Sequence, residues 1–324
     1  MEKVVATVKR EKIGGRRSVP VLSELTRNKT LYLMTLPAVV WFLIFSYLPI
    51  VGVYYAFTNY NFIDGLFKSP FVGFKNFRYL FNGGLNAPVW QLTKNTILYN
   101  LVFIFLGNIL HCVVAIMLTE LPSKRFRKFS QSSLLLPYFV SYVIVGTIAY
   151  NLFSYEFGIY NHARDLMGLE RLNLYGNAGV WPAIIVVFYL WKGMGYGTVV
   201  YVAAIMGIDR EIYEAARIDG CGVVGEIRHI TLPLLKPTFI MLVLFSLGGI
   251  VRGQFELFYQ IIGRNGLLYS TTDILDTYIY RALTVNLNFG LSTAGGLYQS
   301  IFGLICVLSV NLLIKKKNPD YALF

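Results

Sequence analysis

The chain has 324 residues, of which 56% are hydrophobic and only 14% charged, and its mean hydropathy is +0.56. Soluble domains carry about 25% charged residues, so this composition excludes an ordinary soluble protein and predicts an integral membrane protein. The net charge of +12 does not indicate a nucleic-acid partner, because the lysines and arginines gather beside the apolar segments.

Six apolar runs follow one another along the chain, each long enough to cross a hydrocarbon core of about 30 Å as a helix. Runs of this length predict an all-α bundle rather than a barrel, with its backbone hydrogen bonds satisfied inside each helix. We expect a basic tail at residues 1–30, a transmembrane domain at 31–314 with spans at about 31–57, 97–119, 134–153, 181–206, 238–262 and 295–314, and a second tail at 315–324.

The basic residues predict the orientation of these spans, because lysine and arginine are enriched in cytoplasmic loops. Most of the 29 lie in the two tails, in the loop after the second run and in the loop between the fourth and fifth runs. We therefore expect both termini, and that last loop, to be cytoplasmic.

The sequence offers no catalytic or metal-binding motif. It has no GxxxxGK[ST] phosphate loop, no HExxH and no CxxC, and its three histidines are scattered. We therefore expect no enzyme activity and no cofactor in this chain. Such a protein conducts a solute downhill, uses an ion gradient or takes energy from another subunit.

The cytoplasmic loop at residues 207–237 is polar, and its pattern predicts a short amphipathic helix from Ile208 to Ile218. Asp209 can cap the start of this helix, and Asp219-Gly220 can end it with a turn that glycine enters most easily. Taken alone, such a helix is usually an interfacial connector.

Nine residues of this loop resemble the EAA motif of permease subunits of ABC importers, at the spacing of that motif. They are Glu214, Ala215, Ala216, Asp219, Gly220, Ile230, Leu232, Pro233 and Pro237. Cys221, where the family usually has alanine, and Ile227, where an aromatic is common, are departures that could alter the fit to a partner. The resemblance implies a type I permease fold in a bacterial inner membrane.

Other segments resemble the carbohydrate-uptake permeases of the maltose-type class. FVGFKNFRYLF at residues 71–81 is similar to the outer segment before their second span. DILDTYIYR at 273–281, followed by STAGGLYQSIFGL, is similar to the subgroup that imports oligosaccharides from polysaccharides, including the alginate importer. The resemblance extends from about residue 31 to the C-terminus and implies an oligosaccharide substrate.

The resemblance also implies partners. They are a second homologous permease, two ABC ATPase subunits that bind ATP and magnesium, and an extracytoplasmic sugar-binding protein. In that family the EAA loop forms the coupling helix that docks in a cleft of the ATPase. Carried onto this chain, the coupling residues are Glu214, Ala215, Ala216, Arg217, Asp219 and Gly220.

Two cations within the predicted spans are candidates for the sugar path, because ionisable residues at membrane depth usually face the bundle interior or a water-filled cavity. Lys192 has Tyr189 and Tyr196 on its helix face, and Arg252 has Phe255, Glu256 and Tyr259 on its face. Aromatic faces suit pyranose rings, and cations suit a uronate carboxylate. Alternatively, Arg252 and Glu256 neutralise each other at i,i+4 spacing.

Alternative functions stay open at this point. The transported solute could be a neutral oligosaccharide or another small molecule. A secondary transporter should show internal repeats with paired broken helices, and no convincing repeat is visible. A membrane-embedded enzyme would need a nucleophile, an acid-base pair or a metal cluster within the bundle, which the sequence does not supply.

Overall fold

The computed structural model describes residues 28–317, which are helical apart from one isolated antiparallel bridge between Thr58 and Phe71 and the connecting loops. The predicted tails at 1–30 and 315–324 lie largely outside the described residues. Five helical segments are long and apolar enough to cross a membrane, and a sharply bent pair of helices makes a sixth. This agrees in number with the six spans expected from hydropathy when the bent pair counts as one span, although the fifth candidate helix runs from Val223 to Leu247 rather than over 238–262.

The chain divides into two compact units, one ending at Val53 and the other beginning at Tyr54. The first contains α2 (Lys29–Phe42), which continues through a π-helical turn (Leu43–Tyr47) into a 3₁₀ segment (Leu48–Phe57). None of the side chains of α2 is buried. An apolar helix with every face exposed requires lipid or another protein around it.

The second unit begins with a small outer layer made of α3 (Gly65–Lys68) and α4 (Lys75–Leu80). The buried Asn76 holds this layer together by donating hydrogen bonds of 2.9 Å to the carbonyls of Ala56 and Thr58. Most of the FVGFKNFRYLF segment identified in the sequence lies in this layer.

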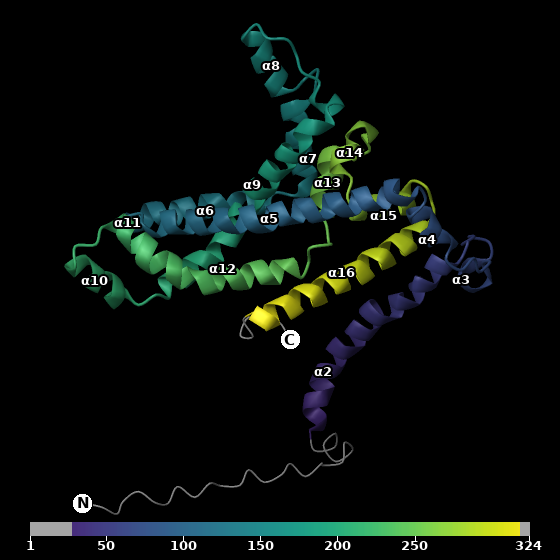
Figure 1. The fold of residues 1–324 in the computed structure, drawn as a ribbon, viewed down its shortest axis with the longest axis horizontal. Coiled ribbons are helices and arrows are strands. Elements are labelled where there is room, and N and C mark those ends of the chain that lie inside the picture. Colours follow the sequence, from purple (N-terminus) through teal and green to yellow (C-terminus); the bar gives the residue numbers. More distant parts are fainter. Residues whose placement is uncertain (1–27, 318–324) are drawn as a thin grey trace, which may run out of the picture. The chain divides into compact units, whose positions relative to one another are not determined.

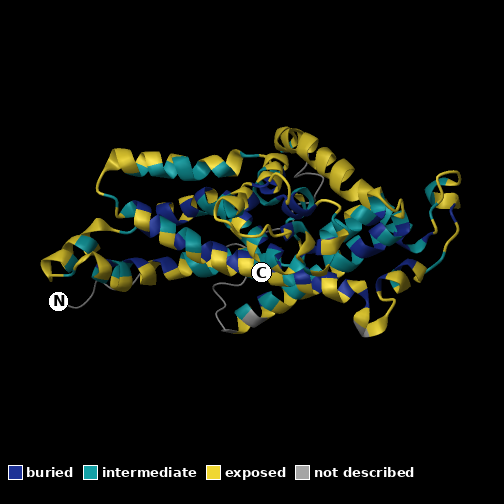
Figure 2. Cartoon of the chain, turned by 90° about the horizontal axis from the view of Figure 1, so that it is seen from above, coloured by how far each residue is buried: buried dark blue, intermediate teal, exposed yellow. Residues whose placement is uncertain are grey.

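The centre of the second unit is the pair α5 (Pro88–Thr119) and α9 (Trp181–Met206), which pack along each other and against α6 (Lys124–Phe139) (Figure 1). Glycine allows this close approach, because a Cβ at Gly195 would collide with the backbone carbonyl of Leu134 on α6. In Figure 2 the buried residues lie mainly on the sides of the helices that face one another. The buried residues form three hydrophobic clusters between the facing sides of the helices, while the outer faces are left for lipid or partners.

The predicted third span is bent by 92° between α6 and α7 (Tyr142–Phe153). Ser141 begins α7 by accepting a hydrogen bond from the amide of Ile144, and a short outer helix, α8 (Ile159–Leu166), follows. α7 packs on α13 so closely that a Cβ at Gly146 would meet the backbone carbonyl of Gln260.

The predicted fifth span is also interrupted. After α10 (Arg210–Ile218), a helix runs through α11 (Val223–Glu226), a π-helical turn (Ile227–Thr231) and α12 (Leu232–Leu247), and then the chain loses helical structure until α13. The remaining helices are α13 (Phe255–Ile262), α14 (Tyr269–Thr272), α15 (Leu275–Thr284) and α16 (Phe289–Lys317). In Figure 1, α10 and α15 lie towards opposite ends of α5.

Candidate functional site

The polar loop forms the expected helix. α10 begins after Asp209, whose side chain accepts a hydrogen bond of 3.1 Å from the amide of Glu211. It ends where Gly220 adopts a φ of +80°, a left-handed conformation that side chains with a Cβ disfavour. Both the predicted cap and the predicted turn are confirmed.

Two side-chain contacts attach α10 to the helix that follows it. The guanidinium of Arg217 donates to both carboxylate oxygens of Glu226, at 2.7 and 3.1 Å, and the hydroxyls of Tyr213 and Thr231 are 3.0 Å apart. The carboxylate of Glu226 is buried, although Arg217 itself is largely exposed. The hydrogen bond and the charge of Glu226 raise the pKa of Arg217. These contacts hold α10 against the α11–α12 helix.

The rest of α10 is open. Glu214 and Ala215 are exposed, Ala216 is half-buried, and the apolar side chain of Ile218 is 86% exposed. An adjoining groove of about 370 Å³ is lined by Glu214, Arg217 and the ends of α5 and α9. The predicted coupling residues therefore lie together on or directly after one helix whose free face can receive another protein.

Lys192 belongs to α9, and its buried side chain reaches the bend between α6 and α7. Its ammonium donates to the carbonyls of Val140 and Tyr138, at 2.6 and 2.8 Å, and of Pro137 at 3.4 Å. These carbonyls lie at the C-terminal end of α6, where a cation compensates the partial negative charge of the helix end, and the carbonyl of Pro137 also accepts from the amide of Val140. This placement gives Lys192 a structural task, and its assignment to the sugar path stays a prediction.

The two tyrosines beside Lys192 stack on aromatic residues of neighbouring helices. Tyr189 lies 3.8 Å from Phe103 of α5 between ring centroids, and Tyr196 lies 4.7 Å from Tyr138 of α6. Tyr189 is half-buried, whereas Tyr196 is 60% exposed. Of this pair, Tyr196 has the surface with which a ligand could make contact.

The non-helical segment between α12 and α13 is held by side chains from three other helices. Asn100 of α5 donates to the carbonyls of Ile250 and Arg252, at 2.8 and 2.9 Å. Gln299 of α16 donates to the carbonyl of Val251 at 2.8 Å, and Asp276 of α15 accepts from the amide of Gly253 at 2.7 Å. Backbone without helical hydrogen bonds is tolerated at membrane depth only where such partners or a water-filled cavity replace them.

A cavity of about 980 Å³ opens beside this break. Its polar lining comes from Arg252, Asp276, Gln299, Ser246 and Ser300. A volume of this order is typical of sites that enclose small molecules, and the mixed donors and acceptors suit hydroxyl-rich ligands.

The i,i+4 alternative for Arg252 and Glu256 does not apply, because Arg252 precedes the start of α13. Among residues 28–317 the two side chains form no ion pair, and both are exposed. Phe255 and Tyr259 of α13 stack on each other at 5.3 Å.

Asn100, Asp276 and Gln299 are not among the candidates that the sequence predicts. Two features of the sequence indicate such an arrangement. Gly248, Gly249 and Gly253 weaken the helix of the fifth apolar run, and Asn100 and Gln299 are amides within apolar helices. Their partners are backbone atoms distant in sequence, so only the folded chain connects them.

Comparisons with known proteins agree with this arrangement. Residues 111–318 match the family described as "Binding-protein-dependent transport system inner membrane component". The chain is similar to Protein LplB of Bacillus subtilis, with 33% identity over 96% of this chain and 99% of the relative. It is also similar to the polygalacturonan/rhamnogalacturonan transport system permease protein YteP of the same organism, with 34% identity over 93% and 92%.

Solved structures show the same fold. A chain of a bacterial alginate ABC transporter, in complex with an alginate pentasaccharide-bound periplasmic protein, superposes with a TM-score of 0.79 at 31% identity, covering 91% of this chain and 97% of that one.

Proposed function

Because the chain belongs to the family of binding-protein-dependent transport system inner membrane components and is a permease of a sugar ABC importer, we propose that it conducts an oligosaccharide from a binding protein into the cytoplasm. The energy comes from two ABC ATPase subunits, which bind ATP and magnesium. A second homologous permease completes the pore. This chain carries no cofactor and catalyses no reaction.

The observation that carries the coupling proposal is the open face of α10. Glu214, Ala215 and the exposed Ile218 form a small surface on a helix fixed by the Arg217–Glu226 pair. In this proposal that surface docks on the ATPase, with Glu214 facing a basic group, Ala215 and Ala216 permitting close contact, and the turn at Asp219-Gly220 orienting the helix.

The proposed path for the sugar passes the cavity beside the break in the fifth span. Arg252 supplies a cation, while Gln299 and Ser300 supply hydrogen-bonding groups. Relatives and neighbours whose names include polygalacturonan and alginate support an acidic oligosaccharide as substrate. Phe255, Tyr259 and Tyr196 are the aromatic residues we assign to this path, and Tyr189, Lys192 and Glu256 remain the other candidates for it.

We place the chain in a bacterial inner membrane with both termini in the cytoplasm. The distribution of lysine and arginine supports this orientation, which puts α10 on the side where ATP is available.

The test is reconstitution of the purified complex with its binding protein in proteoliposomes. Uronate oligosaccharides are expected to stimulate ATP hydrolysis and to be imported. Stimulation by neutral oligosaccharides alone would favour the alternative of a neutral sugar, as the relatives named for lactose and for trehalose and maltose would suggest. Import that continues without any ATPase subunit would contradict the coupling proposal.

A further inference from the structure

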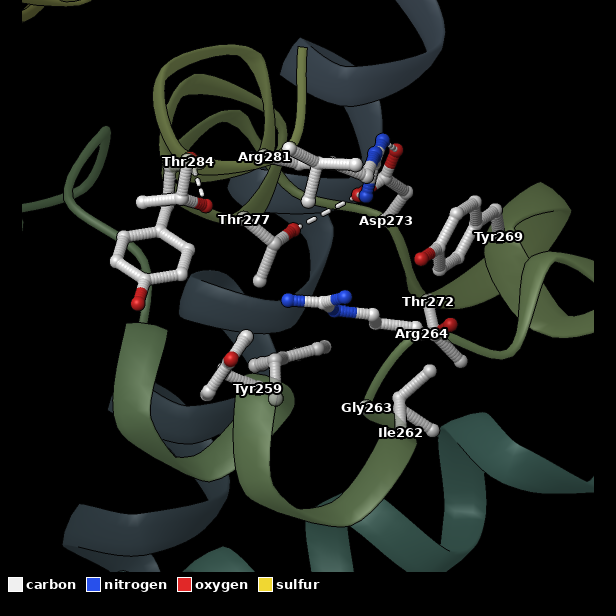
Figure 3. A pocket seen from close by; sticks show the side chains of 13 residues that line it. Tyr259, Ile262, Gly263, Arg264, Tyr269, Thr272, Asp273, Thr277, Arg281 and Thr284 are labelled. Atoms are coloured by element: carbon white, nitrogen blue, oxygen red, sulfur yellow. Dashed lines mark hydrogen bonds and ion pairs between the residues drawn. The ribbon is translucent and has the colours of Figure 1, made fainter. Parts of the chain in front are cut away.

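A second cationic pocket lies between α13 and α15, separate from the cavity at the break. Figure 3 shows the side chain of Arg264 extending across it, between Tyr259 on one side and Thr277 on the other. The space left is about 20 Å³, which is room for about one water molecule. Arg264 is exposed to solvent, so its side chain can move without breaking buried packing.

The carboxylate of Asp273, which lines this pocket, is already paired. It accepts hydrogen bonds from Arg281 at 2.5 and 3.2 Å and from the hydroxyl of Thr277 at 2.8 Å. Arg281 also lies over the ring of Tyr269 at 4.2 Å. This pair is fixed and neutral as a unit, and it offers neither of its charges to a ligand.

Arg264 is left with its charge uncompensated. Among residues 28–317, no carboxylate lies within ion-pair distance of its guanidinium. An arginine without a partner presents its planar donors to solvent, in the geometry that binds a carboxylate through two hydrogen bonds. The pocket therefore carries one net positive charge at its surface.

Aromatic rings adjoin this guanidinium. Tyr259 and Tyr280 lie 5.0 Å apart between centroids, and Phe255 lies 4.8 Å from Tyr280. Aromatic faces pack against the apolar face of a pyranose ring, and tyrosine hydroxyls can bond to its hydroxyl groups. A sugar whose ring rests on these tyrosines could place a carboxylate next to Arg264.

We propose that Arg264, Tyr259 and Tyr280 form a carboxylate subsite that binds one uronate residue of the transported oligosaccharide. The subsite lies beyond the C-terminal end of α13, whereas Arg252 precedes the N-terminal end of the same helix. α13, which is about 12 Å long, lies between these two cations in the chain. A chain carrying several carboxylates can contact both, and a neutral oligosaccharide gains from neither.

This inference rests on the proposed function, and its test compares two forms of one probe. The wild-type complex with its binding protein is given trigalacturonate and, separately, the fully methyl-esterified trisaccharide. For Arg264→Gln the apparent KM of import for the acid is expected to rise about tenfold, which corresponds to the loss of one charge-assisted hydrogen-bonded contact. The KM for the ester should stay within about twofold. Because the binding protein is the same in every variant, comparing wild type with each variant for the same probe removes its contribution.

Arg78→Gln is the matched control, because Arg78 is exposed on α4 and its replacement removes the same charge away from the pocket. Equal losses in both variants would show long-range attraction and overturn the subsite. An equal loss for acid and ester in Arg264→Gln would show a merely structural role and would also overturn it. If wild type imports neither probe nor any other oligosaccharide, the proposed function fails and the subsite with it. Arg264→Lys should fall between wild type and Arg264→Gln, because lysine keeps the charge but not the two-pronged geometry.

Discussion

Arg217 and Glu226 form a two-pronged ion pair that connects the free helix α10 to the long helix entering the membrane. Glu226 is buried while most of the Arg217 side chain is in solvent. The pair therefore acts less as a source of stability than as a fixed connection between α10, the proposed docking helix, and the long apolar helix that follows it.

Exchanging the two charges tests this role. Glu226→Arg and Arg217→Glu are each expected to lower the amount of sugar imported per ATP hydrolysed, because each places like charges together. The double variant should recover much of this ratio, because the exchanged charges attract each other again. If the double variant imports no more sugar per ATP than either single variant, at equal amounts in the membrane, the connecting role of this pair is contradicted.

Glu214→Lys is expected to abolish import and leave membrane insertion intact, because Glu214 is exposed and an exposed substitution changes folding stability by no more than about 0.5 kcal/mol. Uptake and the amount of chain in the membrane are measured together. Glu211→Lys, one turn earlier on α10 and also exposed, is the control and should retain import. Normal uptake by Glu214→Lys would contradict the docking role of this helix.

Lys192→Met is expected to lower the thermal unfolding midpoint of the complex, because the carbonyls of Tyr138 and Val140 at the end of α6 lose the ammonium that donates to them. The cost should be about 2 kcal/mol. Lys94→Met, at an exposed position of α5, should leave the midpoint unchanged. Should Lys192→Met unfold normally while losing acidic substrates only, Lys192 would belong to the sugar path instead.

Gly146→Ala should destabilise the contact between α7 and α13. The added methyl meets the backbone carbonyl of Gln260, which cannot turn away as a flexible side chain would. We expect a loss of about 1–3 kcal/mol, seen as a lower unfolding midpoint in detergent. At Gly193 a Cβ meets nothing within 4 Å, so Gly193→Ala serves as the control and should raise the midpoint slightly, because alanine favours a helix over glycine. Equal effects of the two substitutions would show that helix propensity, not packing, dominates.

Much of the fold can be predicted from hydropathy and motif spacing. The fourth span and α10 match the predicted positions closely, because a long apolar run and a capped amphipathic stretch are local signals. The bend after α6 and the break after Leu247 are not predicted, because hydropathy averages over both interruptions. Each depends on distant donors: Lys192 in one case, and Asn100 with Gln299 in the other.

The candidate site shows the same division. The coupling residues lie close together in the sequence, so the spacing of the motif is enough to identify them. Lys192 and Arg252 look alike in sequence as cations within apolar runs. In the structure, Lys192 donates to carbonyls at the end of α6, whereas Arg252 lines a cavity. Burial and backbone partners distinguish them, and neither can be read from spacing.

The helix that starts at Val223 and ends at Leu247 has 25 residues and extends about 37 Å, with the Arg217–Glu226 pair near one end and the cavity at the other. This helix continues through the π-helical turn at Ile227–Thr231 without ending there. A displacement of α10 would thus be transmitted along this continuous helix to the residues that line the cavity. The segment after Leu247 is hydrogen-bonded to Asn100, Gln299 and Asp276, which belong to α5, α16 and α15. A displacement of this helix would therefore move these three helices as well. In the proposed mechanism, the ATPase would in this way change the shape of the cavity on several sides at once.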